Sequence, residues 1–268
     1  MVQSFHQIHI ISTHLIETTG EHRELPAKTS LKPYSVSCSE RKINVGTRSV
    51  SVEIYAPVTP APTPGILLLH ELMGLLECYR EDATALAAKG YLVYLPDLFS
   101  GGAVKYCIRA LIHEAGRRNR AGSAVNQEIH LLLDALKSDP ACTGSLGMLG
   151  ACLTGGFVLQ MAKRPDMLAP VLYHHSVGIE GAGVPLDESL NEIQRLQGHW
   201  SENDIFCPAS RRNQLKQALG DKLEAYVYNM PHGFRSWSRH LADSETVWQR
   251  TLAFFDQHLQ TGTDDTSP

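Results

Sequence analysis

Short apolar runs alternate with helix-like segments over most of the chain, and this alternation most constrains the fold. The run GILLL at residues 65–69 precedes His70, and its length suits a strand buried on both faces of a parallel sheet. Further strands are predicted at 91–95, 146–151, 168–173, 196–199 and 224–228. Helices are predicted at 79–89, 104–120, 123–137, 152–163, 210–219 and 244–258. Such alternation predicts one doubly wound α/β domain with a mostly parallel central sheet and helices on both faces.

The segment before residue 65 is patterned differently. Residues 35–55 contain two strand-like stretches with a turn near Gly46, and Val50, Val52 and Ile54 alternate in the second stretch. Four prolines in residues 57–64 predict a loop. Residues 1–30 are polar and weakly patterned. We therefore expect a partly ordered extension over 1–30, followed by a single domain over 31–268.

Composition excludes several classes of function. The chain has 268 residues, of which 43% are hydrophobic, enough for one large domain that buries roughly three quarters of its unfolded surface. A net charge of -4 and a pI near 6.3 provide no basic footprint for nucleic acid. No apolar run approaches the roughly 20 residues that a membrane span needs. We expect a monomer or homodimer that acts on a small molecule.

The cysteines and the N-terminus favour a cytoplasmic protein. Six scattered cysteines in a chain of this size are expected to be free thiols rather than disulfides. The N-terminal apolar residues are interrupted by His6, His9 and His14, unlike a signal peptide. No CxxC or HxxxH spacing predicts a metal site, and the zinc-protease-like start His70-Glu71 lacks a second histidine. We expect neither a metal nor a cofactor.

A cysteine lies at a predicted corner between a strand and a helix. In LGACLTGG, residues 149–156, Gly150 precedes Cys152 by two positions, and Gly155 and Gly156 follow it. A nucleophile on a sharp strand-to-helix turn needs such small neighbours. The dipole of the following helix favours an anionic sulfur but supplies no proton acceptor. The alternative is that Cys152 is simply a buried core residue.

Two later loops carry residues that could complete a catalytic group. Asp204 follows the predicted strand 196–199, and His232 follows the strand 224–228, between a proline and a glycine. Alone, Asp204 could merely cap a turn, Glu202 could take its place, and a loop histidine is often unremarkable. The chain order of nucleophile, acid and base, however, is that of α/β-hydrolases.

The loop after the first buried strand supplies two more candidates. In this fold the oxyanion hole combines the amide after the nucleophile with an amide from this loop. These would be the amides of Leu153 and Leu72. Glu71 would then lie near Cys152, where a carboxylate disfavours the thiolate and keeps the resting thiol neutral. Alternatively, Glu71 pairs with a neighbouring arginine or histidine.

Together these motifs resemble the dienelactone hydrolase family, cysteine-dependent members of the α/β-hydrolase fold. The resemblance covers residues 34–259 and rests on the segments HELMG (70–74), GYLVYLPD (90–97), GACLTGG (150–156), ENDIFCP (202–208) and PHGF (231–234). It implies an ester or lactone hydrolase that works through an acyl-enzyme without a cofactor. It also implies that Cys152 is the nucleophile, His232 the base and Asp204 its orienting acid. Glu71 matches the family glutamate that contacts the resting thiol.

The sequence departs from the family pattern at two places. Thr154 stands where the turn usually carries glycine, and a stiff threonine could reshape it. Arg235 is a candidate carboxylate clamp for the substrate, but it is not clearly at the family's position. Other candidate arginines lie in the predicted helix 104–120, namely Arg109, Arg117, Arg118 and Arg120. Dienelactone itself is therefore not secured as the substrate. A thioesterase or acyltransferase on the same scaffold is one alternative, and a non-catalytic small-molecule-binding protein, which Thr154 keeps open, is another.

Overall fold

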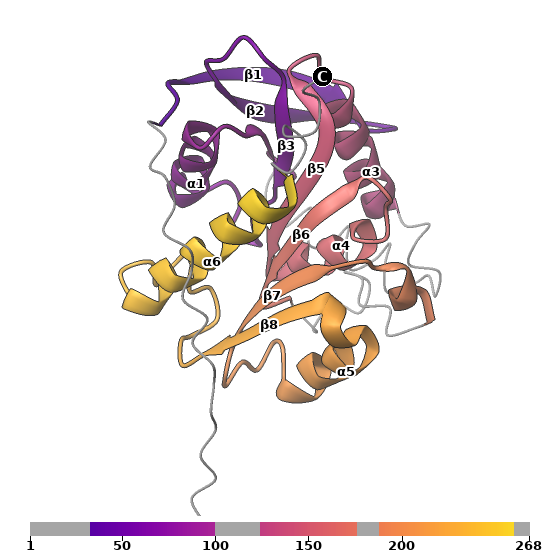
Figure 1. Cartoon of the computed structure of the whole chain (residues 1–268), viewed down its shortest axis with the longest axis vertical. Coiled ribbons are helices and arrows are strands. Elements are labelled where there is room, and N and C mark those ends of the chain that lie inside the picture. Colours follow the sequence, from indigo (N-terminus) through magenta and orange to yellow (C-terminus); the bar gives the residue numbers. More distant parts are fainter. Residues whose placement is uncertain (1–32, 100–123, 176–187, 260–268) are drawn as a thin grey trace, which may run out of the picture. The chain divides into compact units, whose positions relative to one another are not determined.

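The computed structural model describes residues 33–99, 124–175 and 188–259. They form an eight-stranded sheet with the order β1-β2-β4-β3-β5-β6-β7-β8 (Figure 1). The strands are β1 (Val36–Asn44), β2 (Ser49–Pro57), β3 (Thr63–Leu68), β4 (Leu92–Pro96), β5 (Cys142–Ala151), β6 (Met167–Tyr173), β7 (Leu196–Ser201) and β8 (Leu223–Tyr228). Only the pairs of β2 with β1 and with β4 are antiparallel. The predicted mostly parallel α/β sheet is confirmed.

Helices cover both faces of the sheet. They are α1 (Glu77–Ala88), α3 (Ala124–Lys137), α4 (Leu153–Met161), α5 (Ala209–Leu219) and α6 (Ala242–Leu259), with short 3-10 turns η2 (Glu188–Glu192) and η3 (Gly220–Lys222). Helices α3, α4 and α5 contribute to one buried cluster, and α1 and α6 contribute to the other (Figure 1). The sheet therefore separates two apolar layers.

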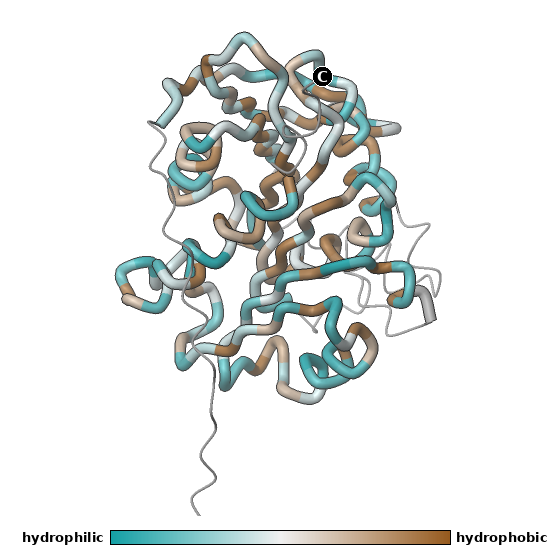
Figure 2. The backbone as a smooth tube through the Cα atoms, viewed as in Figure 1, coloured by the Kyte–Doolittle hydropathy of each residue, from teal (hydrophilic) through white to brown (hydrophobic). Residues whose placement is uncertain are grey.

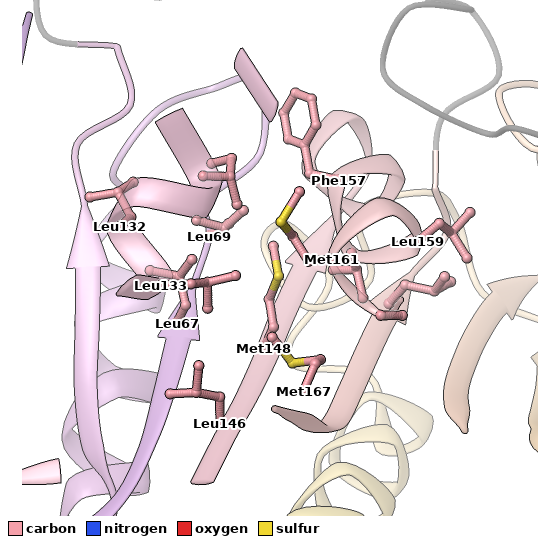
Figure 3. Close-up of a cluster of buried hydrophobic side chains, with 14 of the residues drawn as sticks. Leu67, Leu69, Leu132, Leu133, Leu146, Met148, Phe157, Leu159, Met161 and Met167 are labelled. Atoms are coloured by element: carbon pink, nitrogen blue, oxygen red, sulfur yellow. The ribbon is translucent and has the colours of Figure 1, made fainter. Parts of the chain in front are cut away.

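The first buried strand shows why its apolar run is continuous. Leu67 packs in the cluster with α3 and α4, while its neighbours Ile66 and Leu68 pack in the cluster with α1 and α6. Figure 3 shows Leu67 beside Leu133 of α3 and Met148 of β5. Because successive strand residues point to opposite faces, a strand covered on both sides has no position for a polar residue. Hydrophobic residues accordingly recur along the central strands (Figure 2).

Several predicted boundaries shift, each for a local reason. The predicted loop over 57–64 is too long, because β2 runs to Pro57 and β3 begins at Thr63. The Thr63 N–H donates to the Ala141 carbonyl at 2.9 Å, which starts the pairing early. Strand β5 begins four residues before its predicted start. The extension over 1–30, the predicted helix 104–120 and the expected cap Ser123 lie outside the described residues.

The parallel strands direct their carboxyl ends to one edge of the sheet. There β3 leads to Glu71, β5 to Cys152, β6 to His174, β7 to Asp204 and β8 to His232. This edge is where doubly wound sheets place their ligands. Among the described residues, no helix is long and apolar enough to span a bilayer.

Candidate active site

Cys152 occupies a strained corner between β5 and α4. Its backbone has φ 53° and ψ -119°, a region that residues with side chains rarely adopt. Its N–H donates to the Tyr173 carbonyl at 3.1 Å, and its own carbonyl accepts from Gly155 at 3.2 Å. The side chain is half-buried. Surrounding hydrogen bonds thus hold the sharp turn that a nucleophile elbow requires.

Close packing explains the glycines around the corner. A Cβ atom on Gly150 would lie 2.6 Å from the Thr154 carbonyl oxygen, which no real contact allows. A Cβ on Gly155 would lie 3.1 Å from the Cα of His175. Helix α4 therefore starts directly against β5 and the end of β6. A side chain does not fit at Gly150, and one at Gly155 would require its neighbours to shift by a few tenths of an ångström.

Thr154 fits the corner instead of reshaping it. Its buried Oγ1 accepts the Ala151 N–H at 3.0 Å and donates to the Ala151 carbonyl at 2.9 Å. Among the described residues other than glycine, only Cys152 and His174 have a positive φ. Thr154 consequently needs no glycine-only conformation, and its hydroxyl ties the first turn of α4 to the end of β5.

The structure brings the predicted acid and base together. Nδ1 of His232 lies 2.7 Å from Oδ2 of Asp204. The other carboxylate oxygen of Asp204 accepts the amides of Phe206 at 2.8 Å and Cys207 at 3.1 Å. Burial raises the pKa of Asp204, but the His232 and Phe206 hydrogen bonds outweigh it, and the pKa lies below its usual value. Asp204, rather than the exposed Glu202, therefore orients His232.

The second nitrogen of His232 is available for proton transfer. Nε2 is buried, and no hydrogen-bond partner is found for it within the described part of the chain. The Phe206 ring lies 5.0 Å from the imidazole and the His174 ring 4.1 Å from it, measured between centroids. The ring is thus fixed by Asp204 on one side and by aromatic contacts around it.

Glu71 is buried next to this pair, in the loop that follows β3. Its Oε2 lies 3.8 Å from Nε2 of His174, and its amide donates to the Tyr79 hydroxyl at 3.2 Å. Burial raises the pKa of Glu71. The interactions with His174, the Ser236 hydroxyl and His232 lower it by more, so the pKa lies below its usual value. Glu71 therefore places a carboxylate beside the base loop, contacting a histidine as the alternative interpretation allowed.

His174 is a site residue that the sequence analysis missed. It is fully buried with φ 30°, and its Nε2 accepts the Gly233 N–H at 3.2 Å. It therefore contacts both Glu71 and the loop of His232. Burial lowers its pKa, so the ring is neutral near pH 7. Its position after the strand 168–173, at the carboxyl edge of the sheet, was the available signal.

The two predicted oxyanion amides lie at this same edge, Leu153 at the start of α4 and Leu72 in the loop after β3. Leu153 is the first residue of α4, so its N–H has no acceptor within the helix. Leu72 lies in a turn closed by the Gly74 N–H, which donates to the Glu71 carbonyl at 3.0 Å. His70 anchors this loop, since its Nε2 accepts the Leu98 N–H at 3.1 Å. Both amides therefore remain candidates for binding an oxyanion.

Arg235 makes buried contacts that engage its guanidinium. Nη2 lies 2.5 Å from Oδ1 of Asp82, and Nη1 donates to the Ser244 carbonyl at 3.3 Å. The guanidinium also stacks 4.8 Å above the Trp248 ring. Its role as a carboxylate clamp stays a prediction, and this geometry weighs against it. The other candidate arginines, between 104 and 120, lie outside the described residues.

Metal binding finds no support in the part of the chain that the structure describes. There, no group of three or more histidine, cysteine, aspartate or glutamate side chains is arranged to hold a metal ion. The titratable side chains that the described loops bring to this edge include one thiol, the imidazoles of His232 and His174, and two carboxylates.

Comparison with known proteins identifies the family. The model of the dienelactone hydrolase family matches residues 50–259. The chain belongs to the dienelactone hydrolase family. A carboxymethylenebutenolidase of Rhodococcus opacus is 29% identical over 213 residues, covering 74% of this chain and 82% of that protein. A protein of Azospirillum brasilense, provisionally given the same name, is 30% identical over 79% of this chain and 94% of its own length.

Solved structures show the fold of this dienelactone hydrolase family member. A Klebsiella pneumoniae protein provisionally named a dienelactone hydrolase superposes with a TM-score of 0.67 at 20% identity, over 84% of this chain and 100% of its own. A cold-adapted esterase from an Arctic intertidal metagenomic library superposes with a TM-score of 0.66 at 16% identity, over 87% and 97%. The α/β-hydrolase fold is therefore confirmed, and the family makes the chain a hydrolase of ester or lactone bonds.

Proposed function

We propose that this hydrolase cleaves esters or lactones with a Cys152-His232-Asp204 triad through an acyl-enzyme. One observation carries the proposal: a histidine held 2.7 Å from a buried aspartate lies at the same sheet edge as a cysteine in a strained strand-to-helix turn. Because parallel topology brings every such loop to this edge, the weight of the proposal lies on the buried aspartate–histidine pair and on the strained turn of the cysteine.

The reaction follows from these groups. Nε2 of His232 takes the thiol proton as the Cys152 sulfur attacks the substrate carbonyl. The amides of Leu153 and Leu72 stabilise the negative oxygen of the tetrahedral intermediate. His232 then returns the proton to the leaving alcohol oxygen, which leaves a thioester on Cys152. Water, deprotonated by His232, attacks the thioester, releases the acid and restores the thiol. No cofactor takes part in this sequence.

We also propose that Glu71 keeps the resting Cys152 thiol neutral. A buried carboxylate with a lowered pKa is negatively charged at neutral pH, and it disfavours a second negative charge nearby. A neutral thiol resists oxidation. In Glu71→Gln, the pH profile of the iodoacetamide alkylation rate should shift toward lower pH. An unshifted profile would contradict this role.

Two alternatives share the scaffold. A thioesterase or acyltransferase would use the same thioester but a different donor or acceptor, and a binding protein would keep the pocket without turnover. The binding alternative arose from Thr154, whose hydrogen bonds to Ala151 now fit a well-formed turn. This fit favours the hydrolase.

A panel of substrates tests the proposal directly. The full chain is incubated with p-nitrophenyl acetate, an acyl thioester and a set of lactones, before and after iodoacetamide treatment. We expect ester or lactone turnover that alkylation abolishes, together with slower thioester cleavage. Turnover that survives complete alkylation of Cys152 would exclude the triad, and binding without turnover would favour a binding protein.

The cellular setting is proposed from the thiols. None of the five cysteines among the described residues forms a disulfide, which supports a reducing compartment such as the cytoplasm. The net charge of -4 supports a small-molecule substrate and no nucleic-acid partner. We propose a cytoplasmic enzyme that works without a membrane partner, as a monomer or homodimer.

A further inference from the structure

His174 occupies a strained position at the end of β6. Its backbone has φ 30°, in the left-handed region that residues with side chains rarely adopt. Its N–H donates to the His199 carbonyl at 2.7 Å, and its side chain is fully buried. Strain of this kind persists only where the surrounding structure enforces it, and it gathers at functional sites. The side-chain contacts of His174 indicate which function the strain serves.

Three consecutive residues of the loop that carries His232 contact the ring of His174. The Gly233 N–H donates to Nε2 of His174 at 3.2 Å. The rings of His232 and Phe234 meet the imidazole edge to face, with centroids 4.1 Å and 4.7 Å away. The single hydrogen bond from His232 to Asp204, at 2.7 Å, does not by itself fix the tilt of the His232 ring. His174 therefore adds contacts that set the direction of Nε2 of His232.

Only one neutral form of the His174 ring can make these contacts. Because the Gly233 N–H needs an acceptor, Nε2 of His174 must carry a lone pair and the ring proton must be on Nδ1. Nε2 also lies 3.8 Å from Oε2 of Glu71, a separation longer than a hydrogen bond. A proton added to Nε2 would break the bond from Gly233 and would be attracted to the Glu71 carboxylate. Protonation thus exchanges a contact with the His232 loop for a contact with Glu71.

The other ring nitrogen of His174 borders a small cavity. Nδ1 is buried, and no protein partner is found for it within the described residues. The same holds for Nε of Arg235 and Oε1 of Glu71, and all three residues line the cavity. It has room for about one water molecule, which can accept a hydrogen bond from Nδ1. Asp82 also lines it and pairs with Arg235 at 2.5 Å, so these two charges offset each other.

Burial, rather than the charges around it, keeps the His174 ring neutral at neutral pH. Burial and the proximity of His232 lower the pKa of His174, whereas Glu71 and Asp204 raise it by less, so the pKa lies below its usual value. The other titratable groups around the ring are kept neutral by their own burial, and they are Tyr79, Tyr173, His175 and His199. The neutral ring is therefore present at pH 7 and is lost as pH falls through the pKa of His174.

We propose that His174 is a positioning residue: its neutral ring holds His232 for proton transfer, and protonation of that ring in acid releases the loop. This proposal rests on the hydrolase function proposed above. His174 acts through His232, whose Nε2 takes the thiol proton. A shift of about 1 Å at a reacting group can lower a rate by about 10²-fold. Loss of the Gly233 hydrogen bond should therefore lower kcat more than it changes KM.

The ring form of His174 is measurable without any substrate. In the full chain grown with isotope-labelled histidine, two-bond proton–nitrogen NMR correlations distinguish the two neutral tautomers. The signal that is missing from His174→Gln identifies His174. We expect the ring proton on Nδ1 at pH 7.5. A ring proton on Nε2 at this pH would overturn the proposal.

Two substitutions separate the acceptor of His174 from its titration. His174→Gln keeps an oxygen acceptor for Gly233 and does not titrate, whereas His174→Leu removes the acceptor. With p-nitrophenyl acetate, kcat of His174→Leu should fall by about 10- to 100-fold with KM changed by less than about threefold, and His174→Gln should recover most of the loss. In acid, log kcat of the wild type should fall by about two per pH unit, because His232 and His174 both gain a proton, and that of His174→Gln by about one.

His175→Leu is the matched control, because His175 is the next buried histidine but contacts Trp200 and Cys207 instead of the His232 loop. Its kcat at pH 7.5 should stay close to the wild-type value, and an equal loss in both leucine variants would overturn the role of His174. Equal kcat in the wild type and His174→Leu, or equal acid slopes in the wild type and His174→Gln, would also overturn it and leave the hydrolase function intact. No turnover by the wild type would instead refute the hydrolase proposal, and this role with it.

Discussion

Two cysteines at the carboxyl edge of the sheet have different surroundings. Cys152 lies half-buried in a corner with φ 53°, at the start of α4. Cys207 lies fully buried on the loop of Asp204, with its sulfur 3.8 Å from both ring nitrogens of His175. Burial raises the pKa of the Cys207 thiol to about 12, which disfavours the reactive thiolate despite the histidine neighbour.

The comparison shows that residue type and proximity do not make a nucleophile. Cys207 has a histidine and an aspartate close by, yet it contributes to the site through its amide, which donates to Asp204. Cys152 differs in its strained turn and in being only half-buried. As the N-cap of α4 it also lies at a helix N-terminus, which favours an anionic sulfur. The sharp turn and the partial exposure of the sulfur therefore distinguish the proposed nucleophile from a structural cysteine that also has a histidine neighbour.

Removal of each thiol gives the largest expected contrast. Cys152→Ala should lower kcat by at least about 10³-fold, because triad members act as a unit. Cys207→Ala should cost about 1 kcal/mol of stability and leave the catalytic step in place. Esterase assays and denaturant unfolding of both variants check this. A loss of activity in Cys207→Ala with full activity in Cys152→Ala would reverse the assignment.

In the loop after β7, Asp204 should contribute to kcat, and the neighbouring Glu202 should not. Asp204→Asn should lower kcat by about 10²-fold or more, because the amide no longer orients His232 or stabilises its charged form. Glu202→Gln is the control, since Glu202 is exposed and His232 pairs with Asp204. The two variants should separate in the pH profile of kcat. Equal losses in both would show that overall loop charge acts instead.

The elbow should depend on the Thr154 hydroxyl. Thr154→Val keeps the shape but leaves the Ala151 amide and carbonyl without their partner, which should cost about 1–3 kcal/mol of stability. Thr154→Ser retains the hydroxyl and should lose less. Unfolding free energies of the two variants measure the difference. Equal stability of the two would mean that the hydrogen bonds contribute nothing.

Acid should lower the free energy of unfolding through the buried His175, which lies beside Cys207. Burial lowers the pKa of His175 to about 4, whereas an unfolded histidine titrates near 6.5. Between these two values the unfolded state binds more protons, so stability falls as pH falls and levels off below the folded value. At pH 5.5, His175 should lower the free energy of unfolding by about 1.4 kcal/mol relative to its value at high pH. A flat stability profile between pH 7.5 and 5.5 would contradict this.

The sequence predicted those parts of the fold that short stretches of the chain determine. The apolar run at 65–69 and the glycines around Cys152 each specify local structure, and within the described residues the strands and helices lie close to their predicted positions. From the order of Cys152, Asp204 and His232 along the chain, the meeting of the Asp204 and His232 loops at one edge could be predicted. Parallel topology does this because every strand carries its loop to the same side.

Pairs distant in the chain could not be predicted. Arg235 pairs with Asp82, 153 positions away, and no local pattern signals that contact. His174 likewise gains its role from Gly233 and from the rings packed against it. The tolerance for Thr154 follows from two hydrogen bonds that depend on the final turn geometry. Such contacts follow from tertiary packing, which periodicity does not encode.

Trapping the covalent intermediate tests the central claim most directly. The enzyme is mixed with p-nitrophenyl hexanoate, quenched in acid within the first turnovers, digested and analysed by mass spectrometry. The account predicts a hexanoyl group on the peptide that contains Cys152, and none on the peptide that contains Cys207. A hexanoyl group on any other side chain, or rapid turnover with no acylated peptide and undiminished activity in Cys152→Ala, would contradict it.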